Sequence, residues 1–303
     1  MIEMMTTQPD PRYEQLERRL AEWAAGRDDV RAVVVIGSRA RATRHPPDAW
    51  SDLDAIVFVD DWRPYLQPGE WQTSLEAAFE YPVWFAELEL NWPNDPEYEY
   101  VLEGGLKADL LFVFNPSPRG RQATLAEMCE LSPMSFVFGH AARVLLDKTP
   151  GGEYNPPPAA PEPLPGQAEF DNCIAGVLLE LVRSTTLNGR GELWRAAEAL
   201  NGEIRPHLLA LLEWQARTRP EPGRELWTYG RFLEEWADAR ALAALPATYS
   251  DSTPEGTRRA IRATLELLSW LGPQVAGRLG LVYPAERVRV VSEWMGINPP
   301  VGG

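Results

Sequence analysis

The chain has few cysteines and no long apolar run, and these absences exclude several classes of protein. Cys129 and Cys173 are the only cysteines among 303 residues, so neither a disulfide framework nor a cysteine-rich metal site is expected. No segment approaches the 18 or so consecutive apolar residues that a membrane helix needs, and Met1–Met5 lacks the basic and apolar regions of a signal peptide. We therefore predict a cytoplasmic protein with two buried free thiols and no membrane partner.

Signatures of the common nucleotide-binding folds are also missing. The sequence contains neither a Gly-x-Gly-x-x-Gly run nor a Walker A lysine motif, so no Rossmann site or P-loop is expected. Histidine is scarce, and the scattered positions of His45, His140 and His207 favour structural roles over a metal site. Ser38 lacks the Gly-x-Ser-x-Gly surroundings of a catalytic nucleophile.

Positive charge is scarce in the first half of the chain. Residues 1–166 hold 27 Asp and Glu against 14 Lys and Arg, a net charge of −13 out of −15 for the whole chain. A nucleic-acid partner needs a basic surface, so this imbalance argues against one and suits a small polycation. In the densest acidic run, Glu87, Glu89 and Glu99 are candidate substrate ligands. A solvated surface that only aids solubility explains the same run equally well.

What the first half does contain is a set of small and acidic residues beside apolar runs. Gly37 and Ser38 end one apolar run, and Asp52 and Asp54 precede a second. A small-residue turn frees backbone N–H groups to bind an anion, and two acids two positions apart on an extended segment point the same way. Because close like charges repel, such a pair favours a divalent cation, and Mg²⁺ prefers carboxylate oxygens.

Asp109 is a third candidate ligand. It lies inside residues 106–114, a segment too apolar and too β-prone to be a surface loop. A buried carboxylate needs a partner, which is either a basic residue across the sheet or a metal ion shared with Asp52 and Asp54. The three carboxylates and the small-residue turn together predict a site for phosphoryl or nucleotidyl transfer.

Apolar patterns predict two domains of different class. Strands are expected at 31–36, 55–59, 82–90 and 106–114, and helices at 13–23, 71–79 and 121–131. These elements predict an α+β domain on a mixed sheet at 1–149. Residues 150–166 are rich in Pro and Gly and predict a stiff linker. Apolar residues three and four positions apart then predict a helical bundle at 167–303.

The order of these motifs resembles a known superfamily. Gly-Ser, then Asp-x-Asp, then a later Asp on a strand is similar to the nucleotidyltransferase superfamily, which includes the polymerase β-like enzymes. Several later segments follow the order seen in aminoglycoside 6-adenylyltransferases, also called streptomycin adenylyltransferases: Arg190–Leu193, Ile204–Leu209, Leu212–Trp214, Tyr229–Leu233, Thr248–Ser252 and Val275–Pro284. The resemblance spans roughly Tyr13 to Gly296 and departs from the family at 178–189, where the family carries aromatics and a lysine.

The resemblance implies transfer of AMP from ATP to a hydroxyl of an aminoglycoside such as streptomycin, with release of pyrophosphate and resistance to the antibiotic. Asp52 and Asp54 would hold Mg²⁺, and Asp109 would complete a second metal site or act as general base. Gly37, Ser38 and Arg39 would bind the phosphates. Asp171 and Glu180 of the helical half would contact the substrate, and they rival Asp109 as the general base.

Two other functions are compatible with the same sequence. A nucleotidyltransferase with this motif could modify a protein or a tRNA end, although the acidic charge disfavours RNA. A nucleotide-binding module without turnover could also keep this fold, although the three acids would then have no catalytic use.

Overall fold

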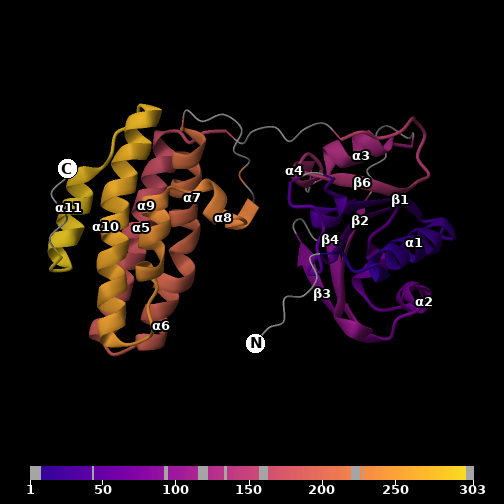
Figure 1. The fold of residues 1–303 in the computed structure, drawn as a ribbon, viewed down its shortest axis with the longest axis horizontal. Helices are drawn as coiled ribbons and strands as arrows, with labels where there is room; N and C mark the ends of the chain where they lie inside the picture. Colours follow the sequence, from indigo (N-terminus) through magenta and orange to yellow (C-terminus); the bar gives the residue numbers. More distant parts are fainter. Residues whose placement is uncertain are drawn as a thin grey trace. The chain divides into compact units, whose positions relative to one another are not determined.

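The computed structural model describes residues 8–42, 44–91, 95–114, 122–132, 135–156, 163–219, 226 and 228–297. The chain divides into two compact units, Met1–Pro161 and Glu162–Gly303 (Figure 1). The division falls inside the segment predicted as a linker, of which 157–162 lie outside the described residues. The prediction that the chain has no signal peptide rests on residues 1–5, which also lie outside the described residues.

The first unit is built on a six-stranded mixed sheet with the strand order β3-β4-β5-β2-β1-β6. The strands are β1 (Val30–Ile36), β2 (Leu53–Val59), β3 (Val83–Asn91), β4 (Asp95–Leu102), β5 (Leu106–Phe114) and β6 (Ala142–Asp147). The two central strands β2 and β5 run parallel, whereas the other neighbouring pairs are antiparallel. The predicted α+β class with a mixed sheet is confirmed.

Helices cover both faces of this sheet (Figure 1). On one face, α1 (Arg12–Ala25) and α2 (Glu70–Phe79) bury Leu16, Leu20 and Leu75 against the strands. On the other, α3 (Leu125–Leu131) and α4 (Ser135–Phe138) cover Ile56 and Phe58. Short 3-10 helices follow β1, β2 and β4: η1 (Gly37–Ala40), η2 (Arg63–Leu66) and η3 (Glu103–Gly105).

The strands β4 and β6 were not predicted from the sequence. In β4, buried Tyr98, Tyr100 and Leu102 alternate with the half-buried Glu97 and Glu99. The acidic run therefore includes one face of an amphipathic strand. Its charged residues hid the alternating pattern from the sequence analysis. β6 is an edge strand whose residues are half-buried or exposed, so its apolar pattern is weak.

The second unit is helical, as predicted. Its elements are α5 (Gln167–Gly189), α6 (Leu193–Glu198), the π-helical turn η5 (Ala199–Glu203), α7 (Arg205–Arg217), η6 (Thr228–Gly230), α8 (Leu233–Trp236), α9 (Ala239–Ala244), η7 (Leu245–Thr248), α10 (Pro254–Leu279) and α11 (Ala285–Trp294). α5, α7 and α10 pack on one another and bury the predicted apolar stripes, among them Leu181, Leu212 and Leu268. Within the described ranges, every helix is too short or too polar to cross a membrane.

A buried ion pair ties α1 to the turn after β1. Arg39 Nε donates to Glu17 Oε1 at 2.9 Å, and the two side chains are only 5% and 9% exposed. The Arg39 guanidinium also lies 4.5 Å from the centroid of the Tyr13 ring. Arg143 of β6 donates to the second oxygen of Glu17 at 2.8 Å, so one carboxylate joins the helix, the turn and the edge strand.

Replacement of Glu17 by alanine would leave the buried Arg39 charge uncompensated. We expect Glu17→Ala to lower the free energy of unfolding of the first unit by about 3 kcal/mol, measured by urea denaturation. The control is Asp61→Ala, which removes the partner of the exposed Arg63 and should leave the unfolding midpoint unchanged. Equally small effects of the two substitutions would contradict this role of the buried pair.

Candidate active site

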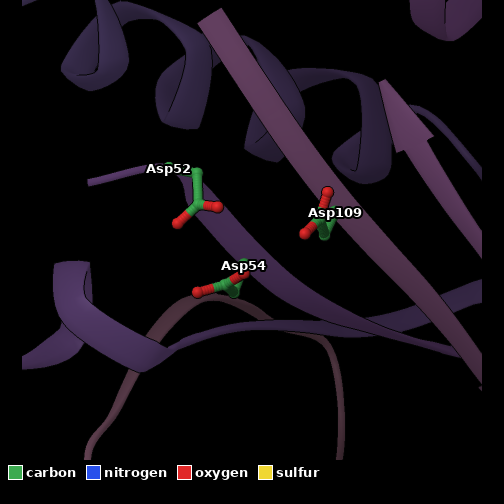
Figure 2. Close-up of side chains that lie close together, drawn as sticks. All are labelled: Asp52, Asp54 and Asp109. Atoms are coloured by element: carbon green, nitrogen blue, oxygen red, sulfur yellow. The ribbon is translucent and has the colours of Figure 1, made fainter. Parts of the chain in front are cut away.

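Three carboxylates meet near the N-terminal ends of the parallel strands. Asp54 of β2 and Asp109 of β5 are register partners, and Asp52 stands two residues before Asp54. Side chains at matching register point to the same face of a sheet. One ligand oxygen of each aspartate lies within 4.8 Å of the other two, and Figure 2 shows the three side chains close together, from β2, from β5 and from the residue before β2. We call Asp52, Asp54 and Asp109 the acidic triad.

Core packing decides which way these side chains point. Ile56 follows Asp54 by two residues, and Leu111 follows Asp109 by two; both are buried in the core beneath α3. Because side chains alternate along a strand, burial of Ile56 and Leu111 sets the two aspartates on that same face.

The turn after β1 lies directly against the triad. Gly37 has a φ of +67°, which glycine adopts at little cost, and a Cβ at this position would collide with the Asp54 carboxylate. Ser38 Oγ is buried and has no hydrogen-bond partner among the described residues. A buried hydroxyl without a partner is costly, and a phosphate oxygen would satisfy it. Both observations are compatible with the phosphate-binding role predicted for Gly37 and Ser38.

The Arg39 guanidinium is only partly engaged, because its Nη1 is buried and has no hydrogen-bond partner among the described residues. Its Nε is bound by Glu17 and its plane lies over Tyr13, so in this structure it anchors η1 to α1. The sequence pattern contained no sign of this contact because Glu17 is 22 residues away. Contact of Arg39 with the pyrophosphate leaving group stays a prediction.

The donor set of the triad fits a magnesium ion. The Asp109 side chain is 15% exposed, and its Oδ1 is a buried oxygen without a hydrogen-bond partner in the described part of the chain. Burial raises the pKa of Asp109; Lys107 opposes this rise, while Asp52 and Glu99 add to it. Three converging carboxylates with an unsatisfied oxygen are the hard ligands that Mg²⁺ prefers.

Lys107 is a site residue that the sequence analysis missed. Its Nζ lies 3.0 Å from Asp109 Oδ2, 3.7 Å from Glu99 Oε2 and 3.9 Å from Asp52 Oδ2. Burial lowers the pKa of Lys107, but the neighbouring carboxylates outweigh it, so the pKa is raised overall. The available signal was its position two residues before Asp109, which places both on one face of the strand.

Strand register places three glutamates of β3 and β4 beside the triad. We call Glu87, Glu89 and Glu99 the acidic row. Glu99 of β4 is opposite Asp109, and Glu87 of β3 is opposite Glu99. Glu89 follows Glu87 by two positions and shares its face. The predicted substrate ligands Glu87, Glu89 and Glu99 therefore lie on the same sheet face as Asp54 and Asp109.

A cavity of about 1050 Å³ adjoins Asp52 and Lys107. It is lined by the segment that leads into α1, by the loop before β2 and by the turn Gly104–Gly105. Trp50, in that loop, is 72% exposed. An exposed indole beside a carboxylate offers a surface on which a ring can stack, and this feature also escaped the sequence analysis.

Asp171 and Glu180 lie on α5, in the second unit. Asp171 Oδ1 accepts a hydrogen bond from Gln167 Nε2 at 2.9 Å. Glu180 is only 10% exposed and lies 3.4 Å from Arg183. Their roles as substrate ligands or as general base stay predictions.

Comparison with known proteins addresses the family. A family model described as streptomycin adenylyltransferase matches residues 12–296. The aminoglycoside 6-adenylyltransferase of Bacillus subtilis (strain 168) is 23% identical over 238 residues, which cover 76% of this chain and 78% of that protein.

Two solved structures are similar at low scores. A crystal structure of an aminoglycoside 6-adenyltransferase from Bacillus subtilis has a TM-score of 0.41 and 18% identity, with 95% of this chain and 98% of that chain covered. A nucleotidyltransferase-like protein from Exiguobacterium sibiricum 255-15 has a TM-score of 0.31 and 10% identity, with coverage of 88% and 77%. The family model spans both units and the whole acidic triad, and on that match the chain belongs to the streptomycin adenylyltransferase family of nucleotidyltransferase enzymes.

Proposed function

We propose that this enzyme transfers AMP from ATP to a hydroxyl of a cationic aminoglycoside, with Mg²⁺ as cofactor. The observation that carries the proposal is the acidic triad, whose oxygens converge within 4.8 Å, directly against the Gly37–Ser38 turn. Nucleotidyl transfer needs a cation to neutralise the triphosphate and N–H donors to bind its phosphates. Membership of the adenylyltransferase family supports the same reaction.

Each part of the site then has a task. Asp52, Asp54 and Asp109 hold Mg²⁺, which supplies charge neutralisation at the phosphates when bound. Gly37 and Ser38 bind the β- and γ-phosphates through backbone N–H groups and the Ser38 hydroxyl. These elements hold the α-phosphorus in place for in-line attack, with pyrophosphate leaving on the side of the turn.

The acceptor hydroxyl must lose its proton as it attacks. A carboxylate that does not bind the metal takes this proton, so Asp109 is the candidate in the first unit only in the alternative in which Asp52 and Asp54 alone hold Mg²⁺. Asp171 and Glu180, on α5 of the second unit, are the alternatives.

The charge pattern across the sheet supports a cationic acceptor. The Gly37–Ser38 turn follows β1, on one side of β2, while the glutamates of β3 and β4 lie on the far side of β5. If the triphosphate binds at the turn, the acceptor can bind on the opposite side of the triad, next to Glu87 and Glu99. Carboxylates there attract ammonium and guanidinium groups and repel anions. Streptomycin is the first acceptor to test because the family carries its name.

A direct assay tests the reaction. The full-length protein is incubated with Mg²⁺, ATP labelled at the α-phosphate and a panel of aminoglycosides that begins with streptomycin. We expect a drug whose mass has increased by one AMP unit, with pyrophosphate in equal amount. Parallel reactions with a basic protein and with tRNA cover the other acceptors. Labelling of either of these, with no modified drug, would contradict the proposal.

The triad should be essential for turnover and dispensable for folding. We expect Asp54→Asn to lower kcat at least about 1000-fold, equivalent to about 4 kcal/mol of barrier, because asparagine keeps the shape of the side chain and loses its charge. Asp60→Asn, just beyond the other end of β2, serves as control and should stay near the parent activity. Turnover of Asp54→Asn within about tenfold of the parent would rule out the metal assignment.

The acidic row should determine affinity for the acceptor. We expect the acceptor KM to rise with salt, because the Debye length falls from about 10 Å at 0.1 M to about 3 Å at 1 M. Glu87→Gln and Glu89→Gln should each raise that KM about threefold without changing the KM for ATP. Glu103→Gln, in η3 beyond the end of β4, is the matched control. An acceptor KM that does not change with salt concentration would mean that the acidic row only aids solubility.

A further inference from the structure

The cavity beside Asp52 lies at the N-terminal ends of β2 and β5. Its walls are formed by residues 8–13, by the loop that carries Trp50 and by the turn between β4 and β5. In the strand order, β5 and β4 lie on one side of β2, whereas β1 and the Gly37–Ser38 turn that follows it lie on the other. The cavity therefore extends from the triad in the direction away from that turn.

A hydrogen-bonded turn holds the backbone of Trp50. Trp50 N donates to Asp48 Oδ1 at 2.8 Å, and Asp48 N donates to Ser51 Oγ at 2.9 Å. Ser51 is buried, so the turn is fixed just before the chain reaches Asp52. The indole itself is largely exposed. An apolar face carried on an ordered backbone can bind a ligand with little further loss of conformational entropy.

Hydrogen bonds also order a second wall of the cavity. Arg12 Nε donates to both oxygens of Asp10, at 3.1 and 3.0 Å, and Arg12 Nη2 donates to Gly104 O at 3.3 Å. Gly104 has a φ of +80°, and a Cβ at this position would collide with the Arg12 guanidinium. Tyr13 Oη accepts a hydrogen bond from Lys107 N at 3.0 Å. The start of α1 is thus tied to the start of β5 before any ligand binds.

The charged side chains that line the cavity balance one another. Asp10 pairs with Arg12, and Asp52 Oδ2 lies 3.9 Å from Lys107 Nζ. A triphosphate gains no net attraction from walls whose charges cancel. Hydroxyl groups of a sugar or cyclitol ring can instead donate to the carboxylates, while the apolar face of the ring packs on the indole of Trp50.

Two observations assign the cavity to the acceptor rather than to the nucleotide. In-line transfer needs the attacking hydroxyl on the side of the phosphorus opposite to the leaving pyrophosphate, and the cavity extends away from the Gly37–Ser38 turn. The cavity is also continuous with the acidic row, because Lys107, which lines it, lies 3.7 Å from Glu99 Oε2. One polycation can therefore occupy the cavity and reach the acidic row.

We propose that this cavity binds the acceptor ring that carries the reacting hydroxyl, and that Trp50 is the surface on which the ring stacks. The cationic substituents of the same molecule then reach the acidic row. This inference rests on the proposed function and adds to it the place of the acceptor and a residue that determines its affinity. The adenine of ATP is the competing occupant, since any base can stack on an indole.

Substitution of Trp50 tests the stacking surface. Steady-state kinetics are measured with each aminoglycoside that accepts AMP. We expect Trp50→Ala to raise the acceptor KM about tenfold, because the ring loses its stacking partner, while kcat and the KM for ATP stay within about threefold. Trp50→Phe keeps an aromatic face and should lie close to the parent. Trp294→Ala, which removes an indole that is 59% exposed on α11, is the matched control.

Two kinetic results would overturn the proposal. One is an acceptor KM that is the same in Trp50→Ala as in Trp294→Ala, because the indole at position 50 would then not contact the acceptor. The other is a raised KM for ATP with an unchanged acceptor KM, which would assign the indole to the nucleobase. A far-ultraviolet circular dichroism spectrum of each variant confirms that the folded protein is being compared.

Protection of an introduced thiol locates the acceptor without turnover. Cys129 and Cys173 are buried, and burial raises the pKa of each thiol to about 12, so both react slowly with iodoacetamide at neutral pH. Ala49→Cys places a thiol in the wall of the cavity and retains Trp50. Ala77→Cys, on the exposed side of α2, is the control.

The rate of alkylation at each introduced thiol is followed by peptide mass spectrometry, with streptomycin and then the rest of the aminoglycoside panel as probes. We expect a bound drug to slow alkylation of the Ala49→Cys protein at least about fivefold, because the ring covers the thiol. ATP with Mg²⁺ should leave that rate unchanged, and neither ligand should affect the Ala77→Cys protein. Protection of the Ala49→Cys protein by ATP and by no drug would overturn the proposal.

These outcomes separate the inference from the reaction itself. A drug that receives AMP yet does not protect the Ala49→Cys protein would overturn the assignment of the cavity and leave the reaction standing. A drug that protects this protein yet never receives AMP would support the cavity as a site for a polycationic ring and contradict the reaction. Neither protection nor transfer with any drug of the panel would overturn both.

Discussion

The site depends on two like charges that the sheet holds side by side. Asp54 and Asp109 are register partners on the parallel strands β2 and β5, and unit charges of the same sign repel by about 4 kcal/mol at 4 Å with an effective dielectric near 20. The strands keep this register because Ile56–Leu111 and Phe58–Val113, the next pairs on the same face, are buried in the core. Apolar packing therefore positions acids that would otherwise separate.

Cations relieve this repulsion. Lys107 neutralises part of it on the side of β4, while Asp109 Oδ1 keeps no partner among the described residues. The sheet thus arranges its groups in one direction: the Gly37–Ser38 turn after β1, the triad at β2 and β5, the Lys107 ammonium, and then glutamates on β4 and β3. This order is compatible with the proposed reaction, in which a polyanionic donor and a polycationic acceptor meet at one phosphorus atom.

Features that depend on near neighbours were predictable. The spacing of Asp52 and Asp54 and the turn at Gly37 follow from strand alternation and small residues, and the triad was predicted from them together with the apolar surroundings of Asp109. Features that depend on distant partners were not. The ion pair of Arg39 with Glu17 of α1 was not predicted, because the two residues are far apart in the sequence. β4 was missed because its outward-facing acids concealed the inward-facing aromatics.

The sequence by itself determined the class of the two halves, the family and the identity of the three acids, because periodicity and motif spacing are local properties of a chain. Only the tertiary structure decided what surrounds those acids. The pairing of β4 with β5 puts Glu99 opposite Asp109 and beside Lys107. Strand neighbours are chosen by the packing of the whole sheet, and a residue's position in the sequence does not record which strand will lie beside it.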